Sequence, residues 1–512
     1  MSEMMITSRE MRALEMNSEY FGVSRLQLME NAGRYVAAEI ASRFTPDKTR
    51  VAVFCGLGGN GGDGFVAARH LTCLGFKVDV ILAGRSESIT DDEARKNWLA
   101  LQPLKGFVTL HEVHDSSLVP SIEAEVVVDA LLGVGLKGTL RPPILQMVRE
   151  INKMKAFRIS VDVPTGINSD SGDVLGKAVR ADLTVTFHKK KPGLVKVKRY
   201  TGELVVRDIG LPSEFERFAG PGEVSLVVRP RPPEAHKGEF GRLLVVGGSE
   251  VFSGAPTLVA LAALRTGVDL TYIAAPHKTA YAISSMSPDL ITIKLEGDHF
   301  NPRNVAIIKR YLETSNAVVM GPGLGLHVET KTAVAEIVNS MEEAKTPLLL
   351  DADGLKAFAE FKRKLGFPLV LTPHAGEYRI LTGREPPKDL RERATEVKNC
   401  AEELGAVMLL KGHVDVISDG KRVKLNFTGN PGMTVGGTGD TLSGIVGAFL
   451  AQRADPFEAA AAGAFINGAA GDFVQSEKGY HMVPTDIIDW IPSVMNDPMS
   501  HAKVRKSAFQ GH

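Results

Sequence analysis

The most constraining feature of this sequence is a run of short apolar segments that alternate with stretches of helical periodicity. The apolar segments of the first run are VAVFCG (51–56), KVDVILAG (77–84), EVVVDALLG (125–133) and FRISVDVPTG (157–166). They are rich in β-branched residues and almost continuously apolar, which is typical of a parallel sheet covered by helices on both faces. The sequence therefore predicts an α/β fold with a three-layer α/β/α arrangement.

The spacing of apolar residues also predicts the helices that flank these strands. Residues 7–44 indicate two helices broken near Gly22, and further helices are expected from Gly64, over 91–101 and from Pro143. Two more apolar segments, ADLTVTF (181–187) and ELVVRDIG (203–210), are expected to close the sheet.

A second run of the same kind follows a proline-rich segment. The second run comprises GRLLVVGGS (241–249), a helix over 254–267, LTYIAAP (270–276), AVVMGPGLG (317–325), PLLLDADGL (347–355), LVLTPHAGE (369–377), AVMLLKGHVDVIS (406–418) and a hairpin around Asp419-Gly420. Proline restricts itself and its predecessor, so we expect neither helix nor central strand between Leu211 and Gly238. The domain boundary is placed near 212–225. The predicted domains are 1–216 and 223–493, with 494–512 as a flexible tail.

Composition narrows the function classes. A chain of 512 residues is too long for one ordinary core, and 60 basic residues balance 60 acidic ones. This balance argues against nucleic acid or an anionic membrane as the main partner. Three scattered cysteines fit a reducing compartment, and no secretory signal or membrane-spanning run is visible. The expected location is the cytoplasm.

The strongest functional motif is GGTGD (436–440), which leads into the apolar helical segment TLSGIVGAFLA. Glycines allow several backbone N–H groups to point at one spot where the helix dipole is also positive, and such a spot holds a phosphoryl group in transfer. Asp440 lies at the helix start and is predicted to accept a proton from an attacking hydroxyl. The alternative is that Asp440 is an ordinary helix N-cap.

Three further motifs lie beyond strands of the same domain. KGHVDVI (411–417) offers Lys411 and backbone amides to nucleotide phosphates, TPHAGE (372–377) contains His374 and Glu377, and MGPGLG (320–325) is another glycine turn. Ligands of open α/β sheets bind at the carboxyl ends of the strands. Separately, His374 could be a surface histidine and Lys411 a solvated charge, but together the motifs predict phosphoryl transfer.

The N-terminal half has its own glycine-rich segment, CGLGGNGGDGFVAARHL (55–71), between a strand and a helix. It lacks the Lys-Ser/Thr pair of a Walker A loop, but Asn60 and Asp63 suggest a bound partner. Two more strand ends, DALLGVGLKGT (129–139) and VDVPTGINSD (161–170), should converge on it. The alternatives are tight helix–strand packing for the glycines, a helix cap for Asp129 and a plain turn at 162–166.

Three side chains at these strand ends offer hard oxygen ligands, namely those of Asn60, Asp129 and Thr165. An oxygen-only set suits an alkali or alkaline-earth cation far better than zinc. The residues alone do not choose among those ions.

The C-terminal motifs resemble the ribokinase-like superfamily, and more closely the ADP/ATP-dependent NAD(P)H-hydrate dehydratases. The resemblance rests on SGAPTLVALAALRTG (253–267), MGPGLG, DADGL (351–355), TPHAGE, KG-x-x-DVI and GGTGD, in that order. It implies a Mg²⁺-assisted reaction in which ADP or ATP phosphorylates the hydroxyl of a hydrated nicotinamide nucleotide, and phosphate then leaves. It places Ala255, Gly323, His374 and Asp440 against the hydrate. It places Lys411, Gly412, His413, Val414, Asp415 and Gly439 against ADP or ATP.

The N-terminal motifs are similar to those of the NAD(P)HX epimerase domain family, which is Rossmann-like. They are ITS-x-EMR, LMENAG (28–33), GNGGDG, DALLG-x-G and VDVPTG, although most members have Asn where this chain has Gly59. The resemblance implies K⁺ held by Asn60, Asp129 and Thr165, and Asp162 beside the ring as the acid/base group. It implies that the hydrate also contacts Gly59, Asn60, Gly61, Gly62, Asp63, Gly133, Val134, Gly135, Leu136, Lys137, Gly138 and Thr139.

Together the two resemblances imply a bifunctional enzyme that epimerises the R and S hydrates of NADH and NADPH and dehydrates the S form. We expect a homo-oligomer with small-molecule nucleotides as its partners. Two alternatives stay open at this point. One is a vitamin-type kinase fused to a nucleotide-binding domain, because such kinases share the GTGD turn. The other is a non-catalytic dimerising scaffold like those of RNA-associated proteins, which the intact polar residues of the first half argue against.

Overall fold

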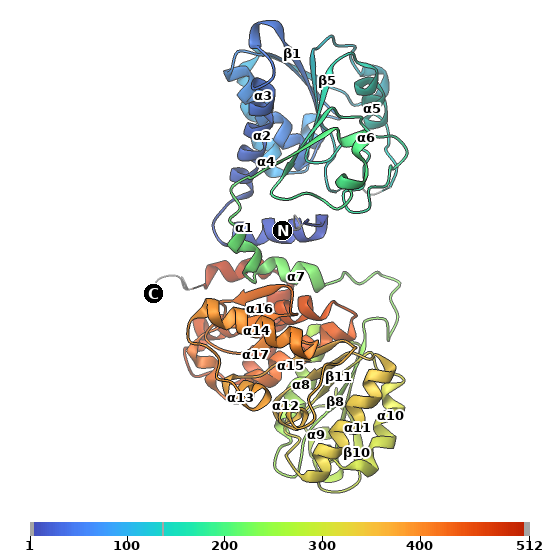
Figure 1. The fold of residues 1–512 in the computed structure, drawn as a ribbon, viewed down its shortest axis with the longest axis vertical. Coiled ribbons are helices and arrows are strands. Elements are labelled where there is room, and N and C mark those ends of the chain that lie inside the picture. Colours follow the sequence, from blue (N-terminus) through green and yellow to red (C-terminus); the bar gives the residue numbers. More distant parts are fainter. Residues whose placement is uncertain (1–4, 136–137, 506–512) are drawn as a thin grey trace. The chain divides into compact units, whose positions relative to one another are not determined.

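A computed structural model describes residues 5–135 and 138–505 and is shown in Figure 1. The chain divides into two compact units, Met1–Phe215 and Glu216–His512, and each contains one sheet flanked by helices. The predicted α/β class with two domains is confirmed. Leu136 and Lys137, which the sequence placed in the substrate-binding set, and residues 506–512 of the expected tail lie outside the described residues.

The first unit is built on a seven-stranded sheet with the order β3-β2-β1-β4-β5-β6-β7, and every strand pair is parallel. Its strands are β1 Arg50–Cys55, β2 Lys77–Leu82, β3 Val108–Glu112, β4 Val126–Ala130, β5 Phe157–Val161, β6 Leu183–Phe187 and β7 Glu203–Arg207. Strand β3 was not predicted. It is an edge strand with only one buried residue, so it lacks the apolar run that identifies the central strands.

Helices cover both faces of this sheet. They are α1 Ser8–Tyr20, α2 Arg25–Ala41, α3 Gly59–Cys73, α4 Asp92–Leu101, α5 Ile144–Lys153 and the short α6 Lys198–Thr201. Alternate residues of β1 enter two different cores: Val51 and Val53 pack with α2, α3 and α4, whereas Ala52 and Phe54 pack with α5. The period-two alternation of a strand therefore produces the predicted three layers.

Helix α3 begins at Gly59, earlier than the predicted start at Gly64. The motif GNGGDG is therefore the first turn of the helix and not a loop. A Cβ added at Gly61 would lie 2.0 Å from the Gly56 carbonyl oxygen, and one at Gly64 would lie 2.7 Å from Ala130 Cβ. Tight helix–strand packing thus explains Gly61 and Gly64, as the alternative interpretation of this motif proposed.

The second unit is built on a nine-stranded sheet with the order β10-β9-β8-β11-β12-β13-β14-β15-β16. Its strands are β8 Arg242–Val246, β9 Leu270–Pro276, β10 Ile291–Leu295, β11 Ala317–Met320, β12 Leu348–Leu350, β13 Leu369–Leu371, β14 Val407–Leu410, β15 Asp415–Ser418 and β16 Val423–Asn426. The strands from β8 to β14 pair in parallel, and β14, β15 and β16 pair antiparallel. The hairpin predicted at Asp419-Gly420 joins β15 to β16, with Gly420 at φ 86°.

Eleven α-helices are described in this unit. They are α7 Pro221–Val227, α8 Gly254–Thr266, α9 His277–Ser284, α10 Val305–Leu312, α11 Val328–Ala344, α12 Ala352–Ala359, α13 Ala375–Thr382, α14 Leu390–Leu404, α15 Thr438–Ala451, α16 Pro456–Lys478 and α17 Pro484–Asn496. The helices α10, α11, α12 and α14 share one buried core with one face of the sheet. Helix α15 packs against α8, β11 and α16 through small residues, and a Cβ added at Gly444 would lie 2.3 Å from the Val259 carbonyl oxygen.

The proline-rich segment between the sheets contains the helix α7, which the sequence analysis excluded. Pro221 occupies the first helical position, where the missing N–H has no intrahelical partner to lose. Glu223 accepts a hydrogen bond from the Gly220 N–H at 2.7 Å and pairs with Lys424 at 2.5 Å. The second unit begins at Glu216, ahead of the expected start at 223, because Phe218 packs on Phe427.

The expected tail at 494–512 is ordered over its first part. Helix α17 continues to Asn496, and Pro498–Lys503 form a 3₁₀ turn. The His501 side chain is fully buried, and its Nε2 lies 3.0 Å from Asp472 Oδ2. The polar and basic composition predicted a flexible tail, but the buried imidazole of His501 holds residues 498–503 in place.

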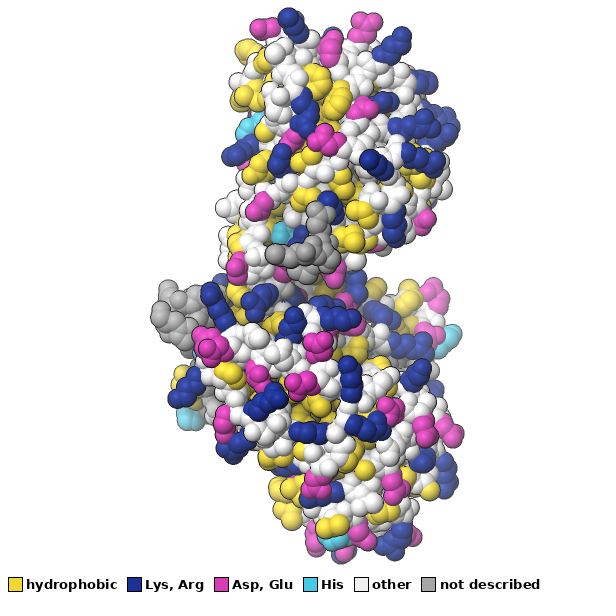
Figure 2. Space-filling view, viewed as in Figure 1, with side chains coloured by type: hydrophobic (Ala, Val, Ile, Leu, Met, Phe, Trp, Pro, Cys, Tyr) yellow, Lys and Arg dark blue, Asp and Glu magenta, His cyan; other side chains and the backbone are white. Residues whose placement is uncertain are grey.

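Three properties of the described residues bear on possible binding partners. No described helix has both the length and the apolar character that crossing a membrane requires. On the visible face, acidic and basic side chains are interspersed over each unit (Figure 2). The three cysteines are free thiols, and Cys55 and Cys400 are buried.

Candidate active sites

The first unit contains a cavity of about 390 Å³ at the carboxyl edge of its sheet. Its walls come from α1, α2, the start of α3, the end of β6 and the segments that follow β4, β5, β6 and β7. The cavity therefore brings the predicted strand-end motifs together, as the topology of a parallel sheet requires. Of the predicted substrate-binding residues, those lining it are Gly59, Asn60, Asp63, Gly133, Val134, Gly135 and Asp162.

The N-terminus of α3 is open toward this cavity. Gly58 is the N-cap and has no side chain to cap the helix, while Gly58 and Gly59 line the cavity. The first N–H groups of a helix have no intrahelical partner, and the helix dipole is positive there, so this turn suits an anionic phosphate. Gly61 and Gly62 are buried and pack on Gly56 and Met29 instead of lining the cavity.

The segment after β4 reaches the cavity only in part. Its first glycines, Gly133 and Gly135, lie on the wall together with Val134. Gly138 and Thr139 are not among the lining residues, and Thr139 lies near Gly176 instead.

Asp162 is held in the cavity wall by a buried lysine. Lys191 Nζ lies 2.5 Å from Asp162 Oδ1, and its side chain is only 1% exposed. Thr186 Oγ1 donates to the same carboxylate oxygen at 2.9 Å. Asp162 itself has φ 60°, the left-handed region that side chains rarely adopt and that occurs disproportionately at functional sites. Asp162 lines the cavity, and the hydrogen bonds described for its carboxylate all go to Oδ1, which leaves Oδ2 without a described protein partner.

Two further carboxyl groups share this cavity. Burial, reinforced by the charge of Asp162, raises the pKa of Glu15 to about 7. Burial and the same neighbour raise the pKa of Asp63 well above its ordinary value. Carboxyl groups close together in a poorly solvated space cannot all ionise, so their protonation states separate. Burial and the nearby negative charge therefore favour the protonated forms of Glu15 and Asp63.

Two of the predicted cation ligands, Asp129 and Thr165, contact each other, and the third, Asn60, lies beside the segment that follows β4. Asp129 is fully buried in β4 and accepts hydrogen bonds from Thr165 Oγ1 at 2.6 Å, Thr165 N at 2.8 Å and Ser160 Oγ at 2.8 Å. Asp129 is therefore no helix cap. Asn60 lies beside Gly133 on the cavity wall, and its Nδ2 is buried with no hydrogen-bond partner among the described residues.

In the second unit, the predicted motifs meet around Lys411. Its Nζ lies 3.0 Å from Asp351 Oδ1 and 3.9 Å from Glu377 Oε2, and both carboxylates are buried. Although burial disfavours the charged form, these carboxylates raise the pKa of Lys411. Ser443 donates to Asp351 Oδ2 at 2.7 Å. Lys411 is therefore not a solvated charge but a fixed ammonium group at the end of β14.

Asp440 lies beside this ammonium group, in the first turn of α15. The helix N-cap is Gly437, at φ 102° and with no capping side chain, so Asp440 is not the N-cap. A Cβ added at the neighbouring Gly439 would lie 3.2 Å from Lys411 Nζ. Burial, with a contribution from Asp351, raises the pKa of Asp440 to about 7. A carboxyl group with a pKa near neutrality can take up a proton during a reaction at physiological pH.

The other predicted contacts of this site are also placed. His374 caps α13: its Nδ1 accepts from Gly376 N at 3.0 Å, and Glu377 Oε2 accepts from His374 N at 3.0 Å. The imidazole keeps an exposed side, so a capping role and a ligand contact are compatible. Gly323 has φ 64°, and a Cβ there would lie 3.4 Å from Ala255 Cβ, which makes these two predicted residues neighbours.

The predicted nucleotide segment 411–415 is a tight turn between β14 and β15. Gly412 N donates to Asp415 Oδ1 at 3.0 Å, and Asn426 Nδ2 donates to Asp415 Oδ2 at 3.0 Å. Burial raises the pKa of Asp415 to about 6. Gly412 and His413 are exposed, whereas Val414 is buried. Asp415 therefore organises the turn, and the exposed part of the turn offers backbone groups.

Sequence reasoning missed four residues that the structure places in these sites: Glu15, Lys191, Asp351 and Ser443. Lys191 is one of three successive lysines after a strand, and only its burial distinguishes it. Asp351 stands in DADGL and Ser443 in the helix after GGTGD, so both lay inside motifs that were recognised for other reasons. Asp351 and Ser443 lie 92 residues apart in the sequence, so no local sequence pattern predicts their contact.

Comparison with known proteins adds independent information. A family model described as NAD(P)H-hydrate dehydratase matches residues 243–493, and one described as YjeF-related protein N-terminus matches residues 25–193. A bifunctional NAD(P)H-hydrate repair enzyme of Pyrobaculum aerophilum is 47% identical over 96% of this chain and 98% of its own. The enzyme of the same description from Hyperthermus butylicus is 45% identical over 99% of this chain and 94% of its own.

Among solved structures, an ADP/ATP-dependent NAD(P)H-hydrate dehydratase from Bacillus subtilis, co-crystallised with ATP/Mg²⁺, is 29% identical. It covers 55% of this chain and 97% of its own, with a TM-score of 0.47. The full-length matches, which include both halves in one chain, decide the family. This chain belongs to the bifunctional NAD(P)H-hydrate repair enzymes.

Proposed function

We propose that the two units carry out successive steps of nicotinamide nucleotide repair. The first unit interconverts the R and S hydrates of NADH and NADPH, and the second unit dehydrates the S hydrate at the expense of ADP or ATP. The observation that carries the proposal is the position of Asp440, which lies at the uncapped start of α15 beside the Lys411 ammonium. This arrangement combines a proton acceptor with fixed positive charge, which phosphoryl transfer requires.

In the second unit, Asp440 takes the proton of the hydrate's hydroxyl as that oxygen attacks the terminal phosphorus of ADP or ATP. The P–O bond to the leaving nucleotide breaks, and the hydrate becomes a phosphate ester. Phosphate then leaves the ring carbon, pushed out by the ring nitrogen, and loss of a proton from the adjacent ring carbon re-forms the double bond of the reduced nucleotide. Lys411 and the N–H groups of the α15 start offset the charge that builds on the transferred group.

The ligand contacts of this site follow from its neighbours. Ala255, Gly323 and His374 are proposed to contact the hydrate together with Asp440. The contacts to ADP or ATP are proposed for Lys411, Gly412, His413, Val414, Asp415 and Gly439. Mg²⁺ is proposed to bind together with the nucleotide, where it would offset phosphate charge.

In the first unit, Asp162 and Glu15 are proposed to act as a base and an acid on one ring. Inverting the hydroxyl-bearing carbon requires that the hydroxyl leave as water and that water return to the other face. Glu15, with its raised pKa, supplies the proton for departure, and Asp162, paired with Lys191, accepts the proton of the incoming water. The open start of α3 and Gly133, Val134 and Gly135 hold the phosphates and ribose.

The oxygen set of the first unit fits an alkali cation in part. Asp129 and Thr165 already contact each other, and the buried amide of Asn60, whose nitrogen lacks a partner, stands beside Gly133. Turning this amide over would bring its oxygen to the position where the nitrogen now lacks a partner, since the two ends of an amide have nearly the same shape. We propose that these three residues hold K⁺, which would offset the charge of the bound phosphates.

The proposal also covers location and assembly. Three free thiols suit a reducing compartment, so we place the enzyme in the cytoplasm, where its NADH and NADPH substrates occur. It is proposed to act as a homo-oligomer with small-molecule partners and without nucleic acid.

The test is an absorbance assay at the band of reduced nicotinamide, with a mixture of R and S hydrates and either ADP or ATP. Wild-type protein should restore the whole mixture, and omission of the nucleotide should abolish restoration. A Glu15→Gln variant should restore only the S fraction at the normal rate and stall on the R fraction. A stable phosphorylated product in place of free phosphate and NADH would contradict the assignment of the second unit.

A further inference from the structure

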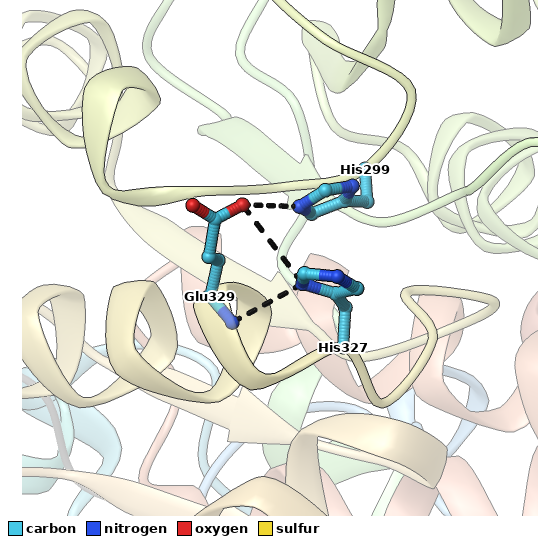
Figure 3. A group of neighbouring side chains, drawn as sticks. All are labelled: His299, His327 and Glu329. Atoms are coloured by element: carbon cyan, nitrogen blue, oxygen red, sulfur yellow. Dashed lines mark hydrogen bonds and ion pairs between the residues drawn. The ribbon is translucent and has the colours of Figure 1, made fainter.

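We propose that His299, His327 and Glu329 form a surface site for a divalent transition-metal ion of the Zn²⁺ class, distinct from both nucleotide sites. Figure 3 shows the three side chains converging from two segments of the second unit. His299 lies between β10 and α10, His327 is the N-cap of α11, and Glu329 stands in the first turn of that helix.

The ligand atoms are close enough to share one ion. One nitrogen of each imidazole and one carboxylate oxygen all lie within 4.8 Å of one another. His299 Nε2 is 2.7 Å from Glu329 Oε2, and His327 Nδ1 is 3.9 Å from the same oxygen. Bonds of about 2.0–2.2 Å to Zn²⁺ place the ligand atoms of a tetrahedral site roughly 3.3 Å apart. Small side-chain rotations would therefore close the set around a metal ion.

The donor set determines the kind of ion. Two imidazole nitrogens and one carboxylate oxygen suit Zn²⁺, Co²⁺, Ni²⁺ or Cu²⁺, whereas Mg²⁺ and Ca²⁺ prefer oxygen alone. His327 Nδ1 accepts the Glu329 N–H at 3.3 Å, so this nitrogen carries a lone pair, and an ion bound there would replace that cap hydrogen bond. The rings of His299 and His327 lie 3.9 Å apart, so a nitrogen of each ring can reach the same ion.

The cluster is open to solvent. The exposed fractions of the side chains are 31% for His299 and 55% for both His327 and Glu329. Three protein ligands with free access leave the remaining coordination positions to water, so an ion can enter and leave without unfolding the chain. The carboxylate of Glu329 offsets the positive end of the α11 dipole, which would otherwise oppose a cation.

The position of the cluster gives the metal a structural consequence. His327 lies two residues after the glycine turn 320–325, whose Gly323 lies against Ala255. His299 belongs to the loop that also contains Asp298, a wall residue of a separate cavity of about 180 Å³. A bound ion would therefore link the end of the glycine turn to a second loop and restrict the motion of both.

The experiment uses full-length, untagged protein freed of metal by chelation. It is titrated with Zn²⁺ by calorimetry and with Co²⁺ by visible absorption, and the metal-bound forms are compared by thermal unfolding. We expect one equivalent to bind to wild type and to raise the unfolding temperature, since an ion that binds only the folded state stabilises it. The same equivalent should be lost in His299→Ala, His327→Asn and Glu329→Gln.

The variants separate metal binding from folding. Asn is a good helix N-cap, so His327→Asn keeps the start of α11 while it removes the imidazole ligand. Exposed His481 is distant from the cluster in sequence, and His481→Ala is the matched control that should keep full binding. Absence of binding in wild type, binding that all three ligand variants retain, or loss in His481→Ala would each overturn the proposal.

Discussion

Lys411 and the buried Asp351 form a partly buried ion pair in the second unit, with Nζ 3.0 Å from Oδ1. Asp351 is held in turn by the Ser443 hydroxyl, which comes from the same helix as Asp440. The ammonium group is thus fixed between a strand end and the start of α15. A charge fixed before the substrate arrives needs no reorganisation during the reaction, which is the basis of electrostatic catalysis.

The first prediction concerns Asp440 as a base. Asp440→Asn should lower the rate of nucleotide-dependent dehydration by about 10²–10⁴-fold, because the amide cannot accept the hydroxyl proton. The rate is measured with pure S hydrate at the reduced-nicotinamide band. Asp489→Asn, an exposed aspartate of the same unit, is the matched control and should leave the rate unchanged. Wild-type rates in Asp440→Asn would remove this residue from the chemistry.

The second prediction concerns the pH dependence of dehydration. Because the pKa of Asp440 is raised to about 7, the deprotonated base should be lost as the pH falls through that value. The ratio kcat/KM should be constant above about pH 8 and fall roughly tenfold per pH unit below 7. The profile is measured with saturating nucleotide and limiting hydrate. A profile that stays flat down to pH 5 would contradict the assignment.

The third prediction concerns stability. Between about pH 4 and 7 the folded state keeps the Asp440 proton while the unfolded chain has released it, so the raised pKa makes stability fall as the pH rises. Asp440→Asn has no ionisable group at this position, so it does not lose stability in this way as the pH rises. At pH 8 the variant should therefore exceed wild type in free energy of unfolding by on the order of 1 kcal/mol, and the difference should shrink toward pH 4.

This stability difference can be measured for one unit alone. The chain has two tryptophans, Trp98 in the first unit and Trp490 in the second. In a Trp98→Phe background, Trp490 fluorescence during denaturant unfolding reports the second unit. If Asp440→Asn were less stable than its Trp98→Phe parent at pH 8, the burial of the ionised Asp440 carboxylate would not be destabilising.

The fourth prediction concerns the buried pair of the first unit. Lys191→Met leaves the Asp162 carboxylate without its partner, so it should lower the free energy of unfolding of that unit by about 3–5 kcal/mol. Epimerisation should be lost, while dehydration of pure S hydrate by the second unit should persist. Lys198→Met, an exposed lysine nearby in sequence, should change neither activity. Normal conversion of R to S hydrate in Lys191→Met would refute the role of the pair.

The fifth prediction concerns the first turn of α3. Gly61→Ala would place a Cβ 2.0 Å from the Gly56 carbonyl oxygen, and relieving this overlap should cost about 1–3 kcal/mol of stability or more. Gly58→Ala meets no atom within 4 Å and should leave the stability nearly unchanged. The two variants are compared by Trp98 fluorescence in a Trp490→Phe background. Equal stabilities would mean that the helix can move away from β1.

Much of the architecture was predictable because the central strands are continuously apolar and their glycine turns stand out. The edge strands β3 and β10 were missed because each has exposed positions that break the apolar run. The early start of α3 was missed because glycine is a poor helix former, and only contact with β1 and β4 shows why glycine is required there.

The residues of the candidate sites also fall into those that the sequence could predict and those that it could not. Asp440, Asp162 and Lys411 were predicted as site residues because they stand in short motifs at strand or helix ends. Lys191 and the pairing of Asp351 with Ser443 could not be predicted, because a buried contact between distant segments leaves no trace in local sequence. Burial and topology supply this information, and only the folded chain contains it.

The cavity of the first unit draws every wall from residues before Phe215, and the cluster around Lys411 draws every member from residues after Glu216. Each half of the gene can therefore lose its function without silencing the other. Two copies damaged in opposite halves would together restore the complete repair sequence, because the epimer released by one can diffuse to the other. Selection can thus tune the two rates independently within a single polypeptide.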